Sequence, residues 1–234
     1  MINDSHCIDR KTALLLGVVG IAGSLTLFAG DMLYYYNGDQ TDILANMASA
    51  SSQRIILSGL AALIATWLYM LGAGQIYYAF QPAKRWLRLA LFLSFSAIMI
   101  AYGIVHGAYM AIAISAQNAS ALGADMQALT QLPIAANNAL RTITYIPFGI
   151  FTLLFIPAVW MRRSFYPRWV LLFHPIILFL LKDVITNHLD GKMKVIIGGG
   201  YLNLILLVFF TASTIALWLN HHPSPKSQSS GAAS

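Results

Sequence analysis

The chain of 234 residues is 58% hydrophobic and only 9% charged, and its mean hydropathy is +0.68. Soluble domains carry about 25% charged residues, so this composition excludes a soluble globular protein and predicts an all-α integral membrane protein that crosses the bilayer several times. The formal net charge of +6 comes largely from Lys and Arg beside apolar runs, where such residues orient spans, and it predicts no nucleic-acid partner.

The residue types also exclude several kinds of site. Cys7 is the only cysteine, which excludes an internal disulfide and a thiolate metal site. No metalloprotease or serine-hydrolase motif occurs, and the run Gly198–Gly200 lacks the lysine spacing of a phosphate-binding loop. We interpret these glycines as a flexible entry to a helix or a place of close helix packing, and we expect no metal and no cofactor.

The first apolar run covers residues 12–34. It reaches Asp31 near its end and leads into the aromatic residues 34–36, as expected for a span that ends at a membrane interface. In the following loop, the pattern of residues 41–47 predicts a capped amphipathic helix on the membrane surface. A second span is predicted over residues 54–80.

The third predicted span, residues 86–116, carries a polar stripe. Tyr102, His106 and Tyr109 are spaced i, i+4 and i+7 and therefore share one face of a helix. Polar groups in hydrocarbon need partners, so we expect this face to point into the bundle. The loop over residues 117–133 holds no Lys or Arg, and its apolar spacing predicts a second surface helix.

Three further spans are predicted over residues 136–161, 169–187 and 195–220. The chain is therefore expected to form one six-helix transmembrane domain, residues 1–220, and a disordered Ser- and Pro-rich tail, residues 221–234. Nine Lys and Arg residues fall on the side of the amino terminus and five on the other side. By the positive-inside rule, both termini are expected in the cytoplasm.

Depth in the membrane can be estimated from a helical rise of about 1.5 Å per residue. His106 lies 18 residues beyond Arg88, about 27 Å from the inner interface, and Asp31 reaches the same level. All six spans bring polar residues to this outer layer, which predicts an outward-facing pocket. The predicted ligand-binding residues are Asp31, His106, Tyr109, Asn138, Arg141, Tyr145, Asp183 and Asn203.

The alternative interpretation of this layer is that helix ends reach the headgroup region, where charged residues need no ligand. It is the one we adopt for Arg54 and Lys182, since long cationic side chains at span ends extend towards water. His174 lies six residues beyond Arg168, about 9 Å from the inner interface, and precedes Pro175. We interpret His174 as a structural residue at a kink, too far from His106 to share a metal with it.

Three functions fit these observations. The pocket is expected to bind a small or lipid-like ligand for transport or sensing, with Arg141 and His106 contacting a polar head and tyrosines packing on its body. The first alternative is an intramembrane enzyme acting on a lipid or isoprenoid, with His106 as proton shuttle oriented by Asp31 or Asp183. The second is a structural subunit whose small-residue strips mediate assembly, including a homo-oligomer. Membrane lipids are expected partners in every case.

The end of the first span, Gly30-Asp31-Met32-Leu33-Tyr34, resembles a group of uncharacterised bacterial six-span membrane proteins, together with the His106 span and the glycine-rich start of the last span. The resemblance covers most of the chain. It implies the six-span architecture and a bacterial cytoplasmic membrane, and it implies no activity.

Overall fold

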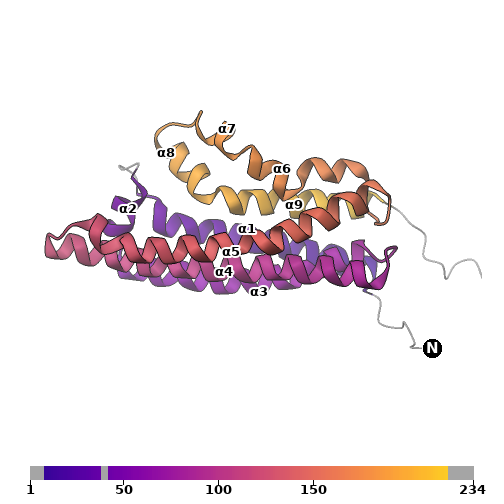
Figure 1. The fold of residues 1–234 in the computed structure, drawn as a ribbon, viewed down its shortest axis with the longest axis horizontal. Coiled ribbons are helices and arrows are strands. Elements are labelled where there is room, and N and C mark those ends of the chain that lie inside the picture. The colour runs from indigo at the N-terminus through magenta and orange to yellow at the C-terminus, as the bar shows by residue number, and fades with distance from the viewer. Residues whose placement is uncertain (1–7, 38–41, 221–234) are drawn as a thin grey trace, which may run out of the picture.

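The computed structural model describes residues 8–37 and 42–220, and the regular structure of this part of the chain is entirely helical (Figure 1). The predicted all-helical fold is confirmed. Within the same residues, five helices are long and apolar enough to cross a membrane. They are α1 (Arg10–Tyr35), α3 (Ser52–Ala79), α4 (Arg85–Leu122), α5 (Met126–Trp160) and α9 (Gly199–Leu219). Cys7 and the predicted tail over residues 221–234 lie outside the described residues.

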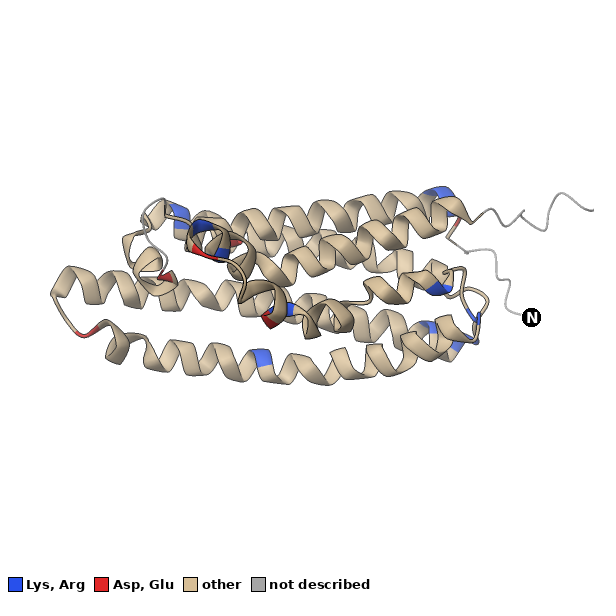
Figure 2. Ribbon diagram, turned by 90° about the horizontal axis from the view of Figure 1, so that it is seen from above, with Lys and Arg blue, Asp and Glu red and all other residues tan. Residues whose placement is uncertain are grey.

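The long helices pack as neighbours in the order α9, α1, α3, α4, α5 (Figure 1). The start of α1 lies beside the end of α9, because Arg10 Nε donates to the Leu217 carbonyl at 3.1 Å and Arg10 Nη2 donates to the Trp218 carbonyl. The described chain therefore begins and finishes at one end of the bundle, where a group of Lys and Arg residues gathers (Figure 2).

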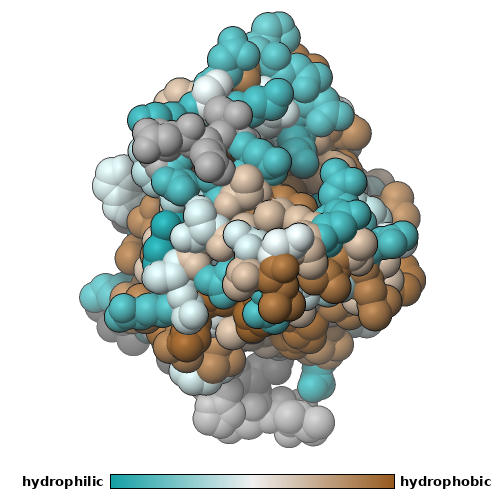
Figure 3. All heavy atoms as spheres, turned by 90° about the vertical axis from the view of Figure 1, so that its left-hand side faces the viewer, coloured by the Kyte–Doolittle hydropathy of each residue, from teal (hydrophilic) through white to brown (hydrophobic). Residues whose placement is uncertain are grey.

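The opposite end of the bundle has a different surface. Figure 3 shows hydrophilic residues gathered over α7 (Lys182–Thr186) and α8 (Gly191–Met193), and hydrophobic residues along the flanks. This distribution is typical of a bundle whose ends meet water and whose flanks meet lipid.

The fifth predicted span, residues 169–187, is not one unbroken helix. The segment forms η1 (Arg168–Phe173), α6 (Pro175–Leu180) and α7 instead. Pro175 has no N–H group to continue the preceding helix, and the His174 side chain accepts the Ile176 N–H at 3.2 Å and thereby starts α6. The segment still runs from the end of α5 to the far end of the bundle, where α8 and the π-helix η2 (Lys194–Gly198) lead into α9 (Figure 1).

The prediction of a separate surface helix within residues 117–133 is wrong. Its periodic residues belong to α4 and α5, which form one long hairpin. Gly123 ends α4 with φ +62°, a left-handed conformation that suits glycine, and Asp125 caps α5 by accepting the Gln127 N–H at 2.9 Å. By contrast, the short helix predicted after the first span is confirmed as α2 (Ile43–Ser49), capped by Asp42.

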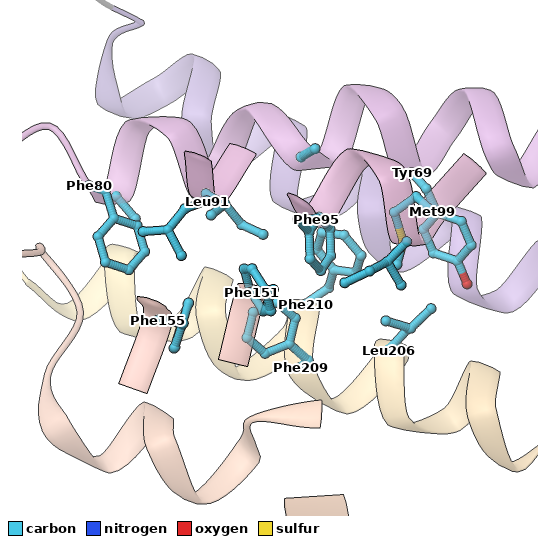
Figure 4. Close-up of a cluster of buried hydrophobic side chains, with 14 of the residues drawn as sticks. Tyr69, Phe80, Leu91, Phe95, Met99, Phe151, Phe155, Leu206, Phe209 and Phe210 are labelled. Atoms are coloured by element: carbon cyan, nitrogen blue, oxygen red, sulfur yellow. The ribbon is translucent and has the colours of Figure 1, made fainter. Parts of the chain in front are cut away.

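An aromatic cluster fills part of the interior of the bundle (Figure 4). Phe95, Phe151, Phe155, Phe209 and Phe210, from α4, α5 and α9, each have at most 1% of their surface exposed. The His174 ring stacks on the Phe151 ring with centroids 5.4 Å apart, so the connection after α5 is held in this cluster. His174 therefore has the structural role that we predict for it.

Close packing of α1 and α3 depends on two facing glycines. A Cβ atom at Gly72 would lie 2.8 Å from the Gly20 Cα, a backbone atom that cannot move without separating the helices. We expect Gly72→Ala to lower the free energy of unfolding by about 1–2 kcal/mol, measured by titration with a denaturing detergent. Gly149→Ala is the matched control, because a Cβ there meets nothing within 4 Å. Equal effects of the two substitutions would contradict the assigned contact.

Candidate ligand-binding cavity

A cavity of about 320 Å³ lies where α1, α4 and α5 face α6, α7 and the start of α9. Six of the eight predicted binding residues line it: Asp31, His106, Tyr109, Arg141, Tyr145 and Asn203. These six side chains, which the depth estimate places at one level, come from four separate helices.

The other two predicted residues lie elsewhere. Asp183 is exposed on α7 and does not line the cavity. Asn138 is also exposed and lies beside a second hollow next to α2, which shares Tyr109 and Arg141 with the first. The buried asparagine is its neighbour Asn137, whose Nδ2 donates to the Val105 carbonyl at 2.7 Å and joins α5 to α4.

Asp31 and His106 form an ion pair in the cavity wall. Asp31 Oδ1 lies 3.1 Å from His106 Nδ1, and the two side chains are 7% and 6% exposed. Asn203 Nδ2 donates to the other carboxylate oxygen, Oδ2. The pair thus connects α1, α4 and α9, and every oxygen of the buried carboxylate has a partner, as burial requires.

Ser58 extends this network to α3. Its Oγ donates to the Gly30 carbonyl at 2.7 Å and lies 3.2 Å from His106 Nε2. The order carboxylate, imidazole and hydroxyl is that of a serine-hydrolase triad. However, Ser58 has no exposed surface and does not line the cavity, so it is not placed to attack a ligand there.

The contacts of Ser58 fix the direction of one hydrogen bond in the network. Ser58 Oγ uses its single proton to donate to the Gly30 carbonyl, so Oγ accepts a hydrogen bond from His106 Nε2. The other ring nitrogen, His106 Nδ1, faces Asp31 Oδ1, so both nitrogens of the imidazole have partners.

Arg141 keeps unused hydrogen-bonding capacity. Its Nη2 donates to the Tyr109 hydroxyl, and its guanidinium carbon lies 5.9 Å from the centre of the Tyr109 ring. Its Nε is buried without a hydrogen-bond partner, and no described carboxylate forms an ion pair with it. Across the cavity, Asn203 Oδ1 is likewise buried without a partner. Such orphaned polar atoms are uncommon in folded proteins and call for an explanation.

Aromatic rings form the side of the cavity between α5 and α6. The Phe179 ring lies 6.1 Å from the Tyr145 ring and 6.2 Å from the Phe148 ring. Sequence reasoning missed Phe179 and Phe148, because an aromatic residue within an apolar run carries no sign that it faces a cavity. It also assigned Lys182 to the membrane interface, whereas Lys182 lines the cavity.

Close packing of the last helix brings backbone to the cavity wall. Gly198 and Gly199 line it, and a Cβ atom at Gly199 would lie 2.8 Å from the Tyr35 ring. Of the two interpretations of this glycine run, the geometry favours close helix packing.

Comparison with known proteins assigns the chain to a family and to no activity. No curated protein and no solved structure matches it. One family model matches residues 2–220, nearly the whole chain, and its description is "Family of unknown function". The chain therefore belongs to this family of unknown function, DUF6796.

Proposed function

We propose that the protein is a multi-pass protein of a bacterial cytoplasmic membrane that binds an amphipathic small molecule or lipid in the cavity. Five apolar helices support the membrane location, and the cluster of Lys and Arg at the end where the described chain begins and finishes supports cytoplasmic termini. In this proposal η1, α6 and α7 form a sixth, broken crossing. Broken helices are tolerated in membranes where they line a cavity, and α6 and α7 do so here through Phe179 and Lys182.

The observation that carries the proposal is the division of the cavity wall into polar and apolar parts. Asp31, His106, Arg141 and Asn203 form the polar part. The apolar part consists of side chains from six helices, namely Leu27, Ile43, Val105, Phe148, Phe179 and Leu202. A volume of about 320 Å³ lies at the lower end of the range for small-molecule sites. The cavity therefore suits a polar head and part of an apolar chain.

Binding is better supported than transport. A transporter needs a polar route across the membrane, whereas Phe95, Phe151 and Phe209 pack against one another towards the basic end of the bundle. We therefore favour a sensing or ligand-holding role over transport.

Binding is also better supported than acid–base catalysis. A catalytic base needs a free nitrogen or oxygen facing the substrate. Both ring nitrogens of His106 and both carboxylate oxygens of Asp31 already have buried protein partners. The network is thus arranged to hold helices and shape a wall, not to move a ligand's proton.

The test is to fill the cavity. Leu202→Trp places a larger side chain on its wall, and native mass spectrometry of protein purified from bacterial membranes measures the amphiphiles that remain bound. We expect a bound amphiphile on the unmodified protein and its loss from this variant. Leu153→Trp is the control, because Leu153 is 75% exposed on α5 and should leave occupancy unchanged. Equal occupancy in both variants, or no bound amphiphile on the unmodified protein, would refute the proposal.

A further inference from the structure

The proposed function leaves open which amphiphile the cavity takes and how it enters. From the charges of the cavity wall and the contacts at its side, we infer that the ligand is an anionic amphiphile, with a carboxylate or phosphate head on Arg141 and a chain that passes between α5 and α6 into the lipid. This inference rests on the proposed function and deepens it.

The sign of the head follows from the charges that line the cavity. The acidic and basic side chains that line the cavity are Asp31, His106, Arg141 and Lys182. The Asp31 carboxylate already has two partners in the wall, since it lies 3.1 Å from His106 Nδ1 and accepts a hydrogen bond from Asn203 Nδ2. Arg141 and Lys182 remain, and no described carboxylate pairs with either of them. A wall with excess positive charge in a low-dielectric setting favours an anion over a neutral or cationic group.

The geometry of the head follows from the donors of Arg141. A guanidinium group presents its N–H donors in a planar fork that matches carboxylate and phosphate oxygens. One arm of the Arg141 fork is occupied by Tyr109, and the buried Nε has no partner. An anionic oxygen beside Arg141 would satisfy this Nε, and a hydroxyl or protonated oxygen on the same head would satisfy Asn203 Oδ1.

The route of the chain follows from the way α6 is held. On one side, the Tyr201 hydroxyl of α9 donates to the Leu178 carbonyl of α6 at 2.8 Å. On the other side, no hydrogen bond between described residues joins α5 to α6 or α7, and Phe179 reaches α5 through ring contacts with Tyr145 and Phe148. Ring contacts separate without leaving a polar group unpaired, so this side of α6 can open at lower cost than the other.

The same side of the cavity borders the outer surface of the bundle. Tyr145 lines the cavity and is 49% exposed, and Leu180, next to Phe179, is 69% exposed. An apolar chain that leaves the cavity past Phe179 would therefore meet lipid directly. A ligand entering this way never has to bring its chain through water.

The experiment compares probes that share a chain and differ in the head. Purified protein in a neutral maltoside detergent is titrated with hexadecyl phosphate, hexadecanoate, hexadecanol and hexadecyltrimethylammonium, and also with inorganic phosphate. We expect both anionic amphiphiles to bind about tenfold or more tightly than hexadecanol and the cationic probe, and inorganic phosphate to bind weakly.

Substitutions test whether the anionic head of the probe binds Arg141. Arg141→Gln should weaken hexadecyl phosphate about tenfold or more while leaving hexadecanol binding nearly unchanged, and Arg141→Lys should have an intermediate effect. Lys192→Gln is the matched control, since Lys192 is an exposed cation near the same end and should not alter binding. Phe179→Ala should accelerate exchange of the bound probe several-fold, because it removes the ring contacts that close the side of the cavity.

The outcomes separate this inference from the function on which it rests. Failure of every amphiphile to bind would refute both. Hexadecanol binding as tightly as hexadecyl phosphate to the unmodified protein, or Arg141→Gln leaving the anionic probes unaffected, would refute the anionic head and leave amphiphile binding standing. Inorganic phosphate matching hexadecyl phosphate would show a site for a free anion, and unchanged exchange in Phe179→Ala would exclude the route past Phe179.

Discussion

Replacing Asp31 with alanine is expected to lower the free energy of unfolding by about 3 kcal/mol. The substitution removes the partner of His106 Nδ1 and the acceptor for Asn203 Nδ2, and both of these side chains are buried. Neither can turn to water without opening the contacts among α1, α4 and α9. Titration with a denaturing detergent in mixed micelles, followed by circular dichroism, measures the change.

A double-mutant cycle attributes this loss to the pair. His106→Ala should cost a similar amount, and the double variant should be more stable than the sum of the single effects predicts, by about 1–3 kcal/mol. Asp183→Asn is the matched control, because Asp183 is exposed and should show no measurable change. Strict additivity of the two single substitutions would mean that Asp31 and His106 do not depend on each other.

The site illustrates what spacing along a helix can predict. Rise per residue gives the depth of a side chain whatever the helix packs against, and this sufficed to bring Asp31, His106, Arg141 and Asn203 to one level. Rotation about the helix axis is harder, because each residue turns the side chain by about 100°. The choice of Asn138 over Asn137 is such an error, since the adjacent residue is the one that faces α4.

Other parts of the site left no trace in the sequence. Ser58 is the single serine of the predicted apolar run 54–80, and only the fold shows that its hydroxyl lies 3.2 Å from His106 Nε2. Phe179 has an apolar side chain, as a lipid-facing residue would. The role of such residues in the site depends on which side chains of other helices lie next to them. Spacing within one helix gives no information on those neighbours.

The fold shows the same division between local and tertiary information. Hydropathy predicts the five long helices. A long apolar segment in lipid must pair its backbone N–H and C=O groups with one another, and a helix does this within the segment itself. Hydropathy predicts the segment after α5 equally well as a span, yet that segment is broken between η1 and α6, at His174 and Pro175, and again at Leu181. Proline marks the first break, whereas the docking of η1 and His174 among Phe151, Phe155 and Phe209 depends on residues far apart in the chain.

Removing the Phe209 ring is expected to destabilise the protein by about 3 kcal/mol and to loosen the broken segment beside the cavity. Phe209 has no exposed surface and contacts Phe95, Phe151 and Phe155 as well as His174. Because lipid chains are as apolar as the side chains of the bundle, the cost of Phe209→Ala comes chiefly from lost packing contacts and the hole that remains.

The destabilisation by Phe209→Ala should be concentrated in the broken segment, where it can be detected. Hydrogen exchange of residues 168–180 should accelerate in Phe209→Ala relative to exchange in α1 and α3, because η1 and α6 are held to the bundle through His174 and its aromatic neighbours. Leu153→Ala is the control, because Leu153 is 75% exposed on α5 and should change neither stability nor exchange. Uniform acceleration across all helices would instead mean that the aromatic cluster stabilises the bundle as a whole and leaves α6 no separate freedom to admit a ligand.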